Sequence, residues 1–397
     1  MIGLLAAFGL ATMNDQTVDA AAKLRQNMAV VPQSAKLPIN RFGVDTLAKL
    51  SATADGKNVM ISPWSLQECF GMLRLGAEGR TEKELKDFLK QAESPMNSAV
   101  GLQQLRNAVK PMETSGQLRQ ANGLWIRKGF EVKPQFVTDV MSFFGAKAKQ
   151  ATFPSPALDE VNGFVSEQTR GKIPKLFDQF DRDTSMVLVN AISFLDKWAS
   201  PFKRENTKNL PFWTSSGGQK SVPTMTGQGE YRYAKGEHCQ ALTLPYKSGL
   251  GMTIVLPDKG TSVASVLGQS DLLNNLNSIS REDRGSVFIP RWQSEFSWNL
   301  RKWMEGQGVK AAFDPASADF SGISNVRLVV SQAVQKTYIK VDEEGTEAAA
   351  ATGITMRPTS IRVGEPFEFR ADHPFAYFIW SPGGVVLFAG IVNNPAG

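Results

Sequence analysis

The chain has 397 residues but few of the side chains that carry metal and nucleophilic chemistry. Its two cysteines, Cys69 and Cys239, can form at most one disulfide, which excludes a small scaffold held by several disulfides. A zinc site with four cysteine or histidine ligands would need both of them and both histidines, His238 and His373. A Ser-His-Asp hydrolase would need a nucleophile and an acid beside one histidine, and the sequence places neither. We therefore expect no metal site, no cofactor and no catalytic residue, with a hydrolase as the least favoured function.

The sequence also lacks an apolar run long enough to cross a bilayer. Residues 2–13 come closest and have about the length of a signal peptide. No basic residue precedes this run, whereas residues 20–22 (AAA) offer small side chains for cleavage. Residues 1–36 are therefore expected to be either an N-terminal arm or a secretion signal. An extracellular, secreted protein is the first expectation and a cytoplasmic protein is the alternative.

The charge of the chain is only mildly one-sided. Lys and Arg number 44 against 38 Asp and Glu, which gives a net charge of +6. The basic residues are dispersed, and their densest group is Lys203, Arg204 and Lys208. A nucleic-acid binder concentrates such residues on one face or along one element. We therefore expect no specific nucleic-acid partner, and weak binding of a polyanion stays open.

The spacing of apolar residues changes along the chain from a helical period to a strand period. In the first half, Thr81 followed by Glu84 is typical of a capping box. Residues 186–195 are a continuous apolar run, which predicts a strand buried on both faces. The predicted helices are 39–50, 65–75, 82–89, 134–144, 158–169 and 296–306, and the other predicted strands are 240–246, 252–256, 287–291, 326–341, 376–380 and 385–392. Helices that gather in one half and strands in the other indicate an α+β fold, and no linker divides residues 37–397, so we expect one domain there.

Residues 343–366 form a long connection between two predicted strands, and long connections are usually functional or disordered. The alanine run at 348–351 favours a helix when taken alone. With a strand period of two, small or apolar side chains instead fall on one face, and Glu347 and Arg357 fall on the other. The small face carries Thr346, Ala348, Ala350, Thr352, Ile354 and Met356. The segment can therefore enter a sheet as a strand, and its small first half can pass between existing strands.

Short motifs that follow one another over about residues 37–395 resemble those of the serpin family of serine protease inhibitors. Each motif is weak alone, but together and in order they are very specific. They are 58–65 (NVMISPWS), 76–81 (GAEGRT), 162–173 (NGFVSEQTRGKI), 190 with 198–202 (WASPF), 244–247 (LPYK) with 254–257 (IVLP), 318–323 (ADFSGI), 372–375 (DHPF) and 387–395 (LFAGIVNNP).

The resemblance implies the serpin fold, with about nine helices, three β-sheets and an exposed reactive-centre loop at about residues 343–366. It also implies a suicide mechanism in which a serine protease attacks the loop and forms an acyl-enzyme. The cleaved loop then inserts into the large sheet as a new strand and distorts the protease before it can deacylate. The implied partner is a covalently bound serine protease, and the inhibitor is expected to be a metastable monomer.

The resemblance assigns roles to single residues. The hinge that opens the loop matches Gly345, Thr346, Glu347, Ala348, Ala349, Ala350, Ala351 and Thr352. The small residues at 345–346 and 348–351 are the pattern of inhibitory members. Ser62, Ser65 and Asn190 match the shutter, a polar cluster beneath the large sheet; a hydrogen-bond cluster without a gating role is the alternative. Gln335 stands where most members carry a histidine, and it cannot titrate, so we expect no pH-sensitive shutter through that position. Trp198 matches the breach, where the loop enters the sheet; an ordinary core tryptophan is the alternative.

The position of the scissile bond follows from counting. Fourteen residues after Gly345, the spacing that the family pattern implies, the bond is Thr359–Ser360. Counting back from the 372–375 motif instead gives a bond near residues 361–363. A proline follows Arg357 and resists a tryptic cut there, and a cut after Arg362 would make the inserting segment too long. Because Thr359 is small and β-branched, we expect an elastase-like or subtilisin-like target.

Two functions on the same fold compete for this chain. The first is an inhibitor that traps its protease covalently. The second is a non-inhibitory serpin-fold carrier or chaperone, and members of that kind tend to have bulky or charged hinge residues. The small hinge of this chain favours the inhibitor.

Overall fold

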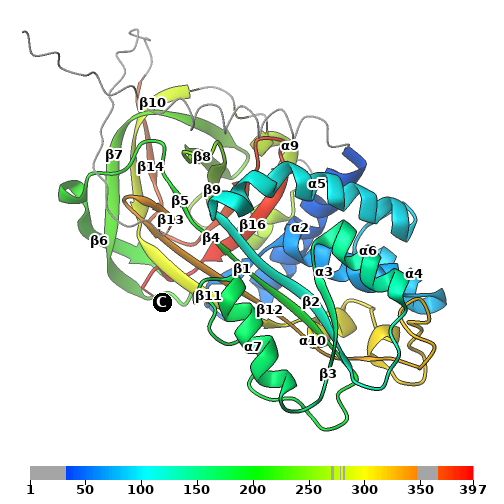
Figure 1. The fold of residues 1–397 in the computed structure, drawn as a ribbon. Coiled ribbons are helices and arrows are strands. Elements are labelled where there is room, and N and C mark those ends of the chain that lie inside the picture. The colour runs from blue at the N-terminus through cyan, green and yellow to red at the C-terminus, as the bar shows by residue number, and fades with distance from the viewer. Residues whose placement is uncertain (1–32, 270–271, 278, 280–281, 347–364, 397) are drawn as a thin grey trace, which may run out of the picture.

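A computed structural model describes residues 33–269, 272–277, 279, 282–346 and 365–396 (Figure 1). The helices are α2 (Gln33–Thr53), α3 (Pro63–Leu75), α4 (Gly79–Phe88), α5 (Pro95–Ser115), α6 (Pro134–Phe144), α7 (Ala157–Gln168), α8 (Val263–Leu267), α9 (Leu272–Asn277) and α10 (Leu300–Gly306), with short 3-10 turns at Arg204–Asn206 and Ala311–Phe313. The strands are β1 (Val59–Ile61), β2 (Leu118–Arg127), β3 (Lys147–Ala151), β4 (Met186–Phe194), β5 (Asp196–Lys197), β6 (Lys208–Trp213), β7 (Gln219–Gly236), β8 (Cys239–Pro245), β9 (Gly251–Pro257), β10 (Glu282–Pro290), β11 (Trp292–Asn299), β12 (Val330–Asp342), β13 (Gly345–Thr346), β14 (Phe367–Arg370), β15 (Phe375–Trp380) and β16 (Val386–Val392).

The described strands form two hydrogen-bonded networks. The first runs β3-β2-β4-β12-β13-β5, with β11 on the other edge of β12. The second runs β1-β16-β15-β9-β8-β7-β10-β14, with β6 on β7. The family resemblance implies three sheets, and the second network joins two of them. The link is the long strand β7, whose first part pairs with β6 and β10 and whose last residues pair with β8. The predicted α+β class is confirmed.

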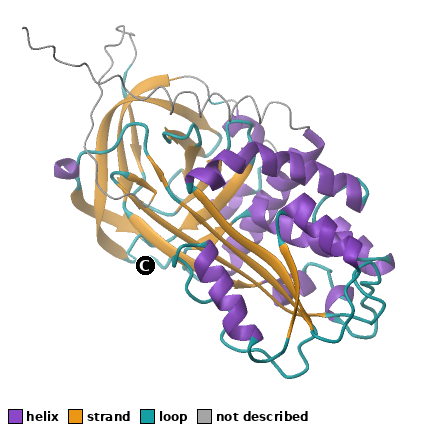
Figure 2. Ribbon diagram, in the orientation of Figure 1, coloured by secondary structure: helices purple, strands orange, loops and turns teal. Residues whose placement is uncertain are grey.

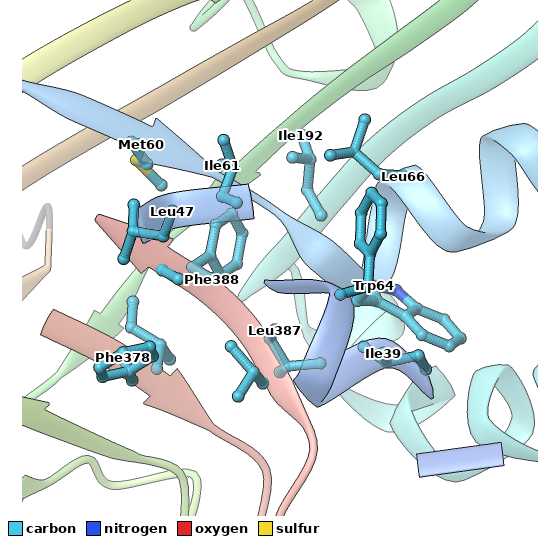
Figure 3. Packing of buried hydrophobic residues seen from close by; sticks show 14 of the residues in the cluster. Ile39, Leu47, Met60, Ile61, Trp64, Leu66, Ile192, Phe378, Leu387 and Phe388 are labelled. Atoms are coloured by element: carbon cyan, nitrogen blue, oxygen red, sulfur yellow. The ribbon is translucent and has the colours of Figure 1, made fainter. Parts of the chain in front are cut away.

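Helices cover the first sheet on both faces (Figure 2). Alternate residues of β4 belong to two different cores: Leu188 and Ile192 pack with α3 and β16, and Val187 and Val189 pack with α7. All nine residues of β4 are buried, so the predicted strand with two buried faces is confirmed. On the α3 side, Trp64, Leu66, Ile192 and Phe388 come together from three different elements (Figure 3).

One predicted helix begins later than its periodicity suggested. Residues 296–299 belong to β11, which pairs antiparallel with β12 from Trp292 to Asn299. The side chain of Asn299 then accepts the backbone N–H of Lys302 at 3.1 Å and caps α10. Pairing with a long neighbouring strand therefore overrides the local helical pattern, and the helix starts at the capping residue.

The predicted capping box at Thr81 and Glu84 is wrong. Helix α4 starts two residues before Thr81, and its N-cap residue is Glu78. The Glu84 carboxylate instead accepts the backbone N–H groups of Lys310 and Ala311 at 2.7 and 2.8 Å. Burial alone would raise the pKa of Glu84, but these N–H groups and the Arg80 guanidinium outweigh burial and lower it. The acidic residue therefore joins two distant segments of the chain rather than capping its own helix.

Replacing Glu84 with Gln should lower the free energy of unfolding by about 1–2 kcal/mol, because a neutral amide replaces a charged acceptor of two backbone N–H groups. The shift in the urea midpoint measures it. Glu305 is the control, because it pairs with Arg301 on the exposed face of α10, and Glu305→Gln should cost less than about 0.5 kcal/mol. Equal costs for the two variants would contradict the bridging role.

Candidate functional site

β4 and β12 lie side by side in the first sheet and pair in parallel (Figure 1). The pairing runs from Met186 opposite Val330 to Ser193 opposite Tyr338. Beyond that point β13 lies between β12 and β5, with Thr346 opposite both Val341 and Asp196. The sheet is thus closed over the length of β4, and it takes in two residues of the following chain at one end.

The turn into α3 places two serines beneath this pair of strands. Ser62 precedes Pro63, and its Oγ accepts the backbone N–H of Ser65 at 3.1 Å as an N-cap. The same hydroxyl donates to the backbone oxygen of Leu387 at 2.7 Å. Both serines have no exposed surface, so each hydroxyl depends on a protein partner.

Asn190 on β4 points toward these serines. Its Nδ2 donates to Ser65 Oγ at 2.6 Å and to the Ser65 backbone oxygen at 3.0 Å. Its Oδ1 accepts a hydrogen bond from Gln335 Nε2 at 2.6 Å, and Gln335 lies opposite it in the strand register. Gln335 Oε1 in turn accepts the backbone N–H of Ser62 at 3.4 Å. The four residues matched to the shutter therefore form one buried cluster that joins β4, β12 and α3; its gating role stays a prediction.

Two further members of this cluster, Asn122 and Glu68, escaped prediction. Asn122 on β2 accepts a hydrogen bond from Asn190 Nδ2 at 2.8 Å, and its own Nδ2 donates to Glu68 Oε2 at 3.2 Å. Glu68 follows Ser65 by three residues, so the two share one face of α3, and that spacing is a signal that could have found it. No such signal marked Asn122, since β2 itself was not predicted.

Trp198 lies where the chain leaves β12. Its indole Nε1 donates to the backbone oxygen of Asp342 at 2.9 Å, and its backbone N–H donates to the oxygen of Glu344 at 2.9 Å. Its ring stacks on Tyr246, with 4.4 Å between the ring centroids and 15° between the planes. The tryptophan is buried, but its bonds go to the segment that leads into the loop, as the breach assignment would require.

The first two hinge residues are fixed at this end of the sheet. Thr346 is fully buried, and its hydroxyl lies 2.6 Å from the hydroxyl of Tyr246, a contact that the sequence did not predict. Gly345 has a φ of +154°, and a Cβ there would lie 2.2 Å from the backbone oxygen of Asp196. Only glycine fits this approach of two backbones.

Glu343, just before the hinge, is buried with an exposed fraction of 2%. Its Oε1 accepts a hydrogen bond from Thr207 Oγ1 at 2.5 Å and lies 3.5 Å from Arg291 Nε. The backbone oxygen of Glu343 accepts the N–H of Phe202 at 2.9 Å. The base of the loop is therefore held by side chain and backbone together.

Residues 347–364 of the predicted loop lie outside the described residues. This applies to the hinge residues Glu347, Ala348, Ala349, Ala350, Ala351 and Thr352, to the bond Thr359–Ser360, and to Arg357 and Arg362. Their roles stay predictions. Residues 1–32 of the expected N-terminal arm or signal also lie outside the described residues.

The histidines do not form a hydrolytic site in the described part of the chain. Both ring nitrogens of His373 are engaged, Nδ1 with Asp372 Oδ1 at 2.7 Å and Nε2 with the backbone oxygen of Pro257 at 2.8 Å. His238 is exposed and lies 3.8 Å from Glu237. Neither arrangement presents a serine or cysteine nucleophile to the imidazole.

Cys69 and Cys239 are free and buried, and burial raises the pKa of both thiols.

Within the described ranges, the structure contains no group of three or more His, Cys, Asp or Glu residues suited to hold a metal ion. Among the same residues, no helix is both long and apolar enough to cross a membrane.

The chain is similar to known proteins over most of its length. Residues 38–395 match the family model Serpin (serine protease inhibitor). An uncharacterized serpin-like protein of Thermococcus kodakarensis is 35% identical over 367 residues, which cover 90% of this chain and 85% of that protein. The leukocyte elastase inhibitor of Bos taurus is 34% identical over 373 residues, covering 89% of this chain and 98% of the relative.

Solved structures agree with the sequence matches. Mouse protein-Z dependent protease inhibitor has a TM-score of 0.82 at 25% identity, and the match covers 94% of this chain and 99% of that one. Native protease nexin-1, solved with heparin, has a TM-score of 0.77 at 27% identity, with 90% and 100% covered.

Proposed function

The chain belongs to the serpin family and has the serpin fold, and from that premise we propose that it inhibits a serine protease as a suicide substrate. The observation that carries this proposal is the start of the loop. Gly345 and Thr346 already pair between β12 and β5, at the end where β4 and β12 separate. The next residues continue the same two-residue period with small side chains. This supports insertion of the cleaved loop between β4 and β12.

The protease supplies the chemistry in this proposal. Its serine oxygen attacks the carbonyl of Thr359 and forms an ester, while the peptide bond to Ser360 breaks and the new amine takes a proton. The inhibitor needs no nucleophile, base or metal of its own. The shutter residues Ser62, Ser65, Asn190 and Gln335 would hold β4 on β12 until the cut, and Trp198 would guide the hinge at the breach.

Insertion supplies the driving force. Residues 346–359 would form a strand about 45 Å long at roughly 3.3 Å per residue. If each new backbone hydrogen bond nets about 0.5–1.5 kcal/mol, the total is on the order of 10 kcal/mol. A free energy of that size is large enough to distort a bound active site before water removes the acyl group.

The proposed target is an elastase-like or subtilisin-like protease, since Thr359 is small and a leukocyte elastase inhibitor is among the relatives.

We propose that residues 37–397 form one domain, with the reactive loop at about 343–366. The protein is proposed to act as a monomer. We also propose that the exposed Lys203, Arg204 and Lys208 bind polyanions weakly, because a structural neighbour was solved with heparin. A secreted location rests only on residues 1–36, and a cytoplasmic one is the alternative.

The test is incubation with pancreatic elastase, subtilisin and trypsin in separate reactions, followed by denaturing gels and mass spectrometry. We expect an SDS-stable complex with elastase or subtilisin and release of residues 360–397, a peptide of 38 residues. A peptide that begins at Val363 would move the reactive bond to Arg362, and one that begins at Pro358 would move it to Arg357.

The Thr359→Asp variant should lose the complex with elastase, whereas Arg357→Ala should keep it. Complete cleavage without a complex for every protease would overturn inhibition by covalent trapping. It would favour the carrier or chaperone alternative instead.

A further inference from the structure

A carboxyl group lies buried against the shutter of this chain. The Glu68 side chain has no exposed surface, and its Oε1 lies 3.2 Å from Arg106 Nη1 on α5. Arg106 Nη2 also lies 3.3 Å from Glu113 Oε1, and Glu113 follows about two turns later on the same face of α5. Burial raises the pKa of Glu68 to about 7, because the loss of hydration outweighs the attraction of Arg106; Glu113 adds to the rise. Glu68 therefore changes charge near neutral pH, where Gln335 cannot.

Glu68 also connects helix α3 to β2, the strand that pairs with β4. Asn122 donates to Glu68 Oε2 from β2, and β2 pairs with β4 along its whole length. When β4 leaves β12, β2 has to move with it. The hydrogen bonds from Asn122 to Glu68 and from Asn190 to Ser65 join this pair of strands to α3, so they must break.

Solvent is close to the buried carboxyl group. Arg106 and Glu113 have side chains that are 16% and 18% exposed, and with Asn122 they line a cavity of about 170 Å³ between α5 and β2. Withdrawal of Asn122 from Glu68 would open that cavity toward the carboxylate. An ionised carboxylate gains far more from contact with water than a neutral carboxyl group does.

We propose that Glu68 is a positioning residue that makes loop insertion depend on pH: its ionised carboxylate favours separation of β4 from β12, and its neutral form holds the sheet closed. The proposal rests on the proposed function, since it assumes that the loop inserts between these strands. The sign follows from linkage. The closed sheet binds the Glu68 proton more tightly than a wetter, opened sheet does, so a rise in pH through neutrality favours opening.

Other ionisable groups near Glu68 are few in the described structure. Arg106 and Glu113 face it from α5, and Cys69 is its neighbour on α3. β2 contributes the amides of Gln120 and Asn122, and the cations Arg119 on β2 and Lys147 on β3 line the same cavity. The Cys69 thiol stays neutral, because burial raises its pKa. Asp196 at the hinge end of the sheet has a pKa raised by burial to about 6, so its titration falls at lower pH.

The test measures sheet opening without a protease. A synthetic peptide with the sequence of residues 346–359 is incubated with the full chain from pH 5.5 to 8.5, and native mass spectrometry follows the rate of the 1:1 complex. Over the whole titration the rate should rise by about tenfold, which corresponds to relief of about one pKa unit, and most of the rise should fall between pH 6 and 8. Glu68→Gln keeps an acceptor for Asn122 and should hold the rate at the low-pH value, with any step near pH 6 from Asp196 intact.

Two more variants separate titration of Glu68 from a merely structural role. Arg106→Met removes the cation that lowers the pKa of Glu68 and should move the midpoint of the profile upward. Glu113→Gln removes the anion that raises it and should move the midpoint downward. A rate in the unmodified chain that does not change with pH, or a Glu68→Gln profile with the same step near pH 7, overturns the role of Glu68 alone. A chain that binds no peptide at any pH overturns the proposed function on which it rests.

Discussion

Thr346→Arg should convert the chain from an inhibitor into a substrate. Thr346 is fully buried, and its hydroxyl lies 2.6 Å from the hydroxyl of Tyr246. A guanidinium there would not fit the space that a threonine fills, and burial of its charge costs several kcal/mol. The loop would still be cut, but the disturbed pairing of β13 would keep the residues after it from entering the sheet in time. We expect the yield of SDS-stable complex to fall by at least about tenfold while cleavage continues, as measured by moles of inhibitor consumed per mole of protease.

Two variants control for this effect. Thr346→Ser keeps the hydroxyl and the small volume, so its complex yield should match that of the unmodified chain. Thr138→Arg adds the same charge at an exposed position of α6, and should also leave inhibition unchanged. Full inhibition by Thr346→Arg would mean that loop insertion does not depend on the buried place of residue 346 in the sheet.

Asn190→Ala should destabilise the closed sheet by about 3–5 kcal/mol. Asn190 makes hydrogen bonds to Ser65, Asn122 and Gln335. Its removal leaves several buried groups without partners, and each such group costs about 1–3 kcal/mol. Because the lost bonds join β4 to α3 and β12, we also expect the uncut loop to insert more readily on storage. The urea midpoint and the loss of inhibitory activity over days at 37 °C measure the two effects.

Asn209→Ala is the matched control, since Asn209 lies exposed on β6. Exposed substitutions of this kind usually change stability by less than about 0.5 kcal/mol. If Asn190→Ala lowers the urea midpoint but leaves the stored protein fully active, the cluster supports folding and does not gate the sheet.

Elements with a strong and unbroken pattern could be predicted from the sequence. The apolar run of β4 and the helix α6 are examples, and both lie where their periodicity put them. The helix α5 and the strand β2 escaped prediction. α5 contains Pro111 and many polar residues, and the middle of β2 (RQANG) has neither the alternation nor the β-branched residues of a typical strand.

In the site, too, the sequence predicted which residues meet only where they lie close together in the chain. Ser62 and Ser65 belong to one motif, so the sequence placed them together. Asn122 and Glu68 are 54 positions apart, and Tyr246 and Thr346 are 100 positions apart. Only the packing of β2 on α3 and of β13 beside Trp198 brings these pairs together. No local pattern encodes such contacts, and in particular none shows that a glutamate on α3 would lose all contact with water.

The central claim is that the cut loop becomes a strand between β4 and β12. The most direct test is thermal unfolding of the chain before and after the loop is cut by a protease that it does not trap. An inserted strand worth on the order of 10 kcal/mol should raise the unfolding temperature by roughly 10–15 °C. Thr346→Arg, cut in the same way, should show little of this rise. Equal unfolding temperatures for the cut and uncut chain would contradict the account.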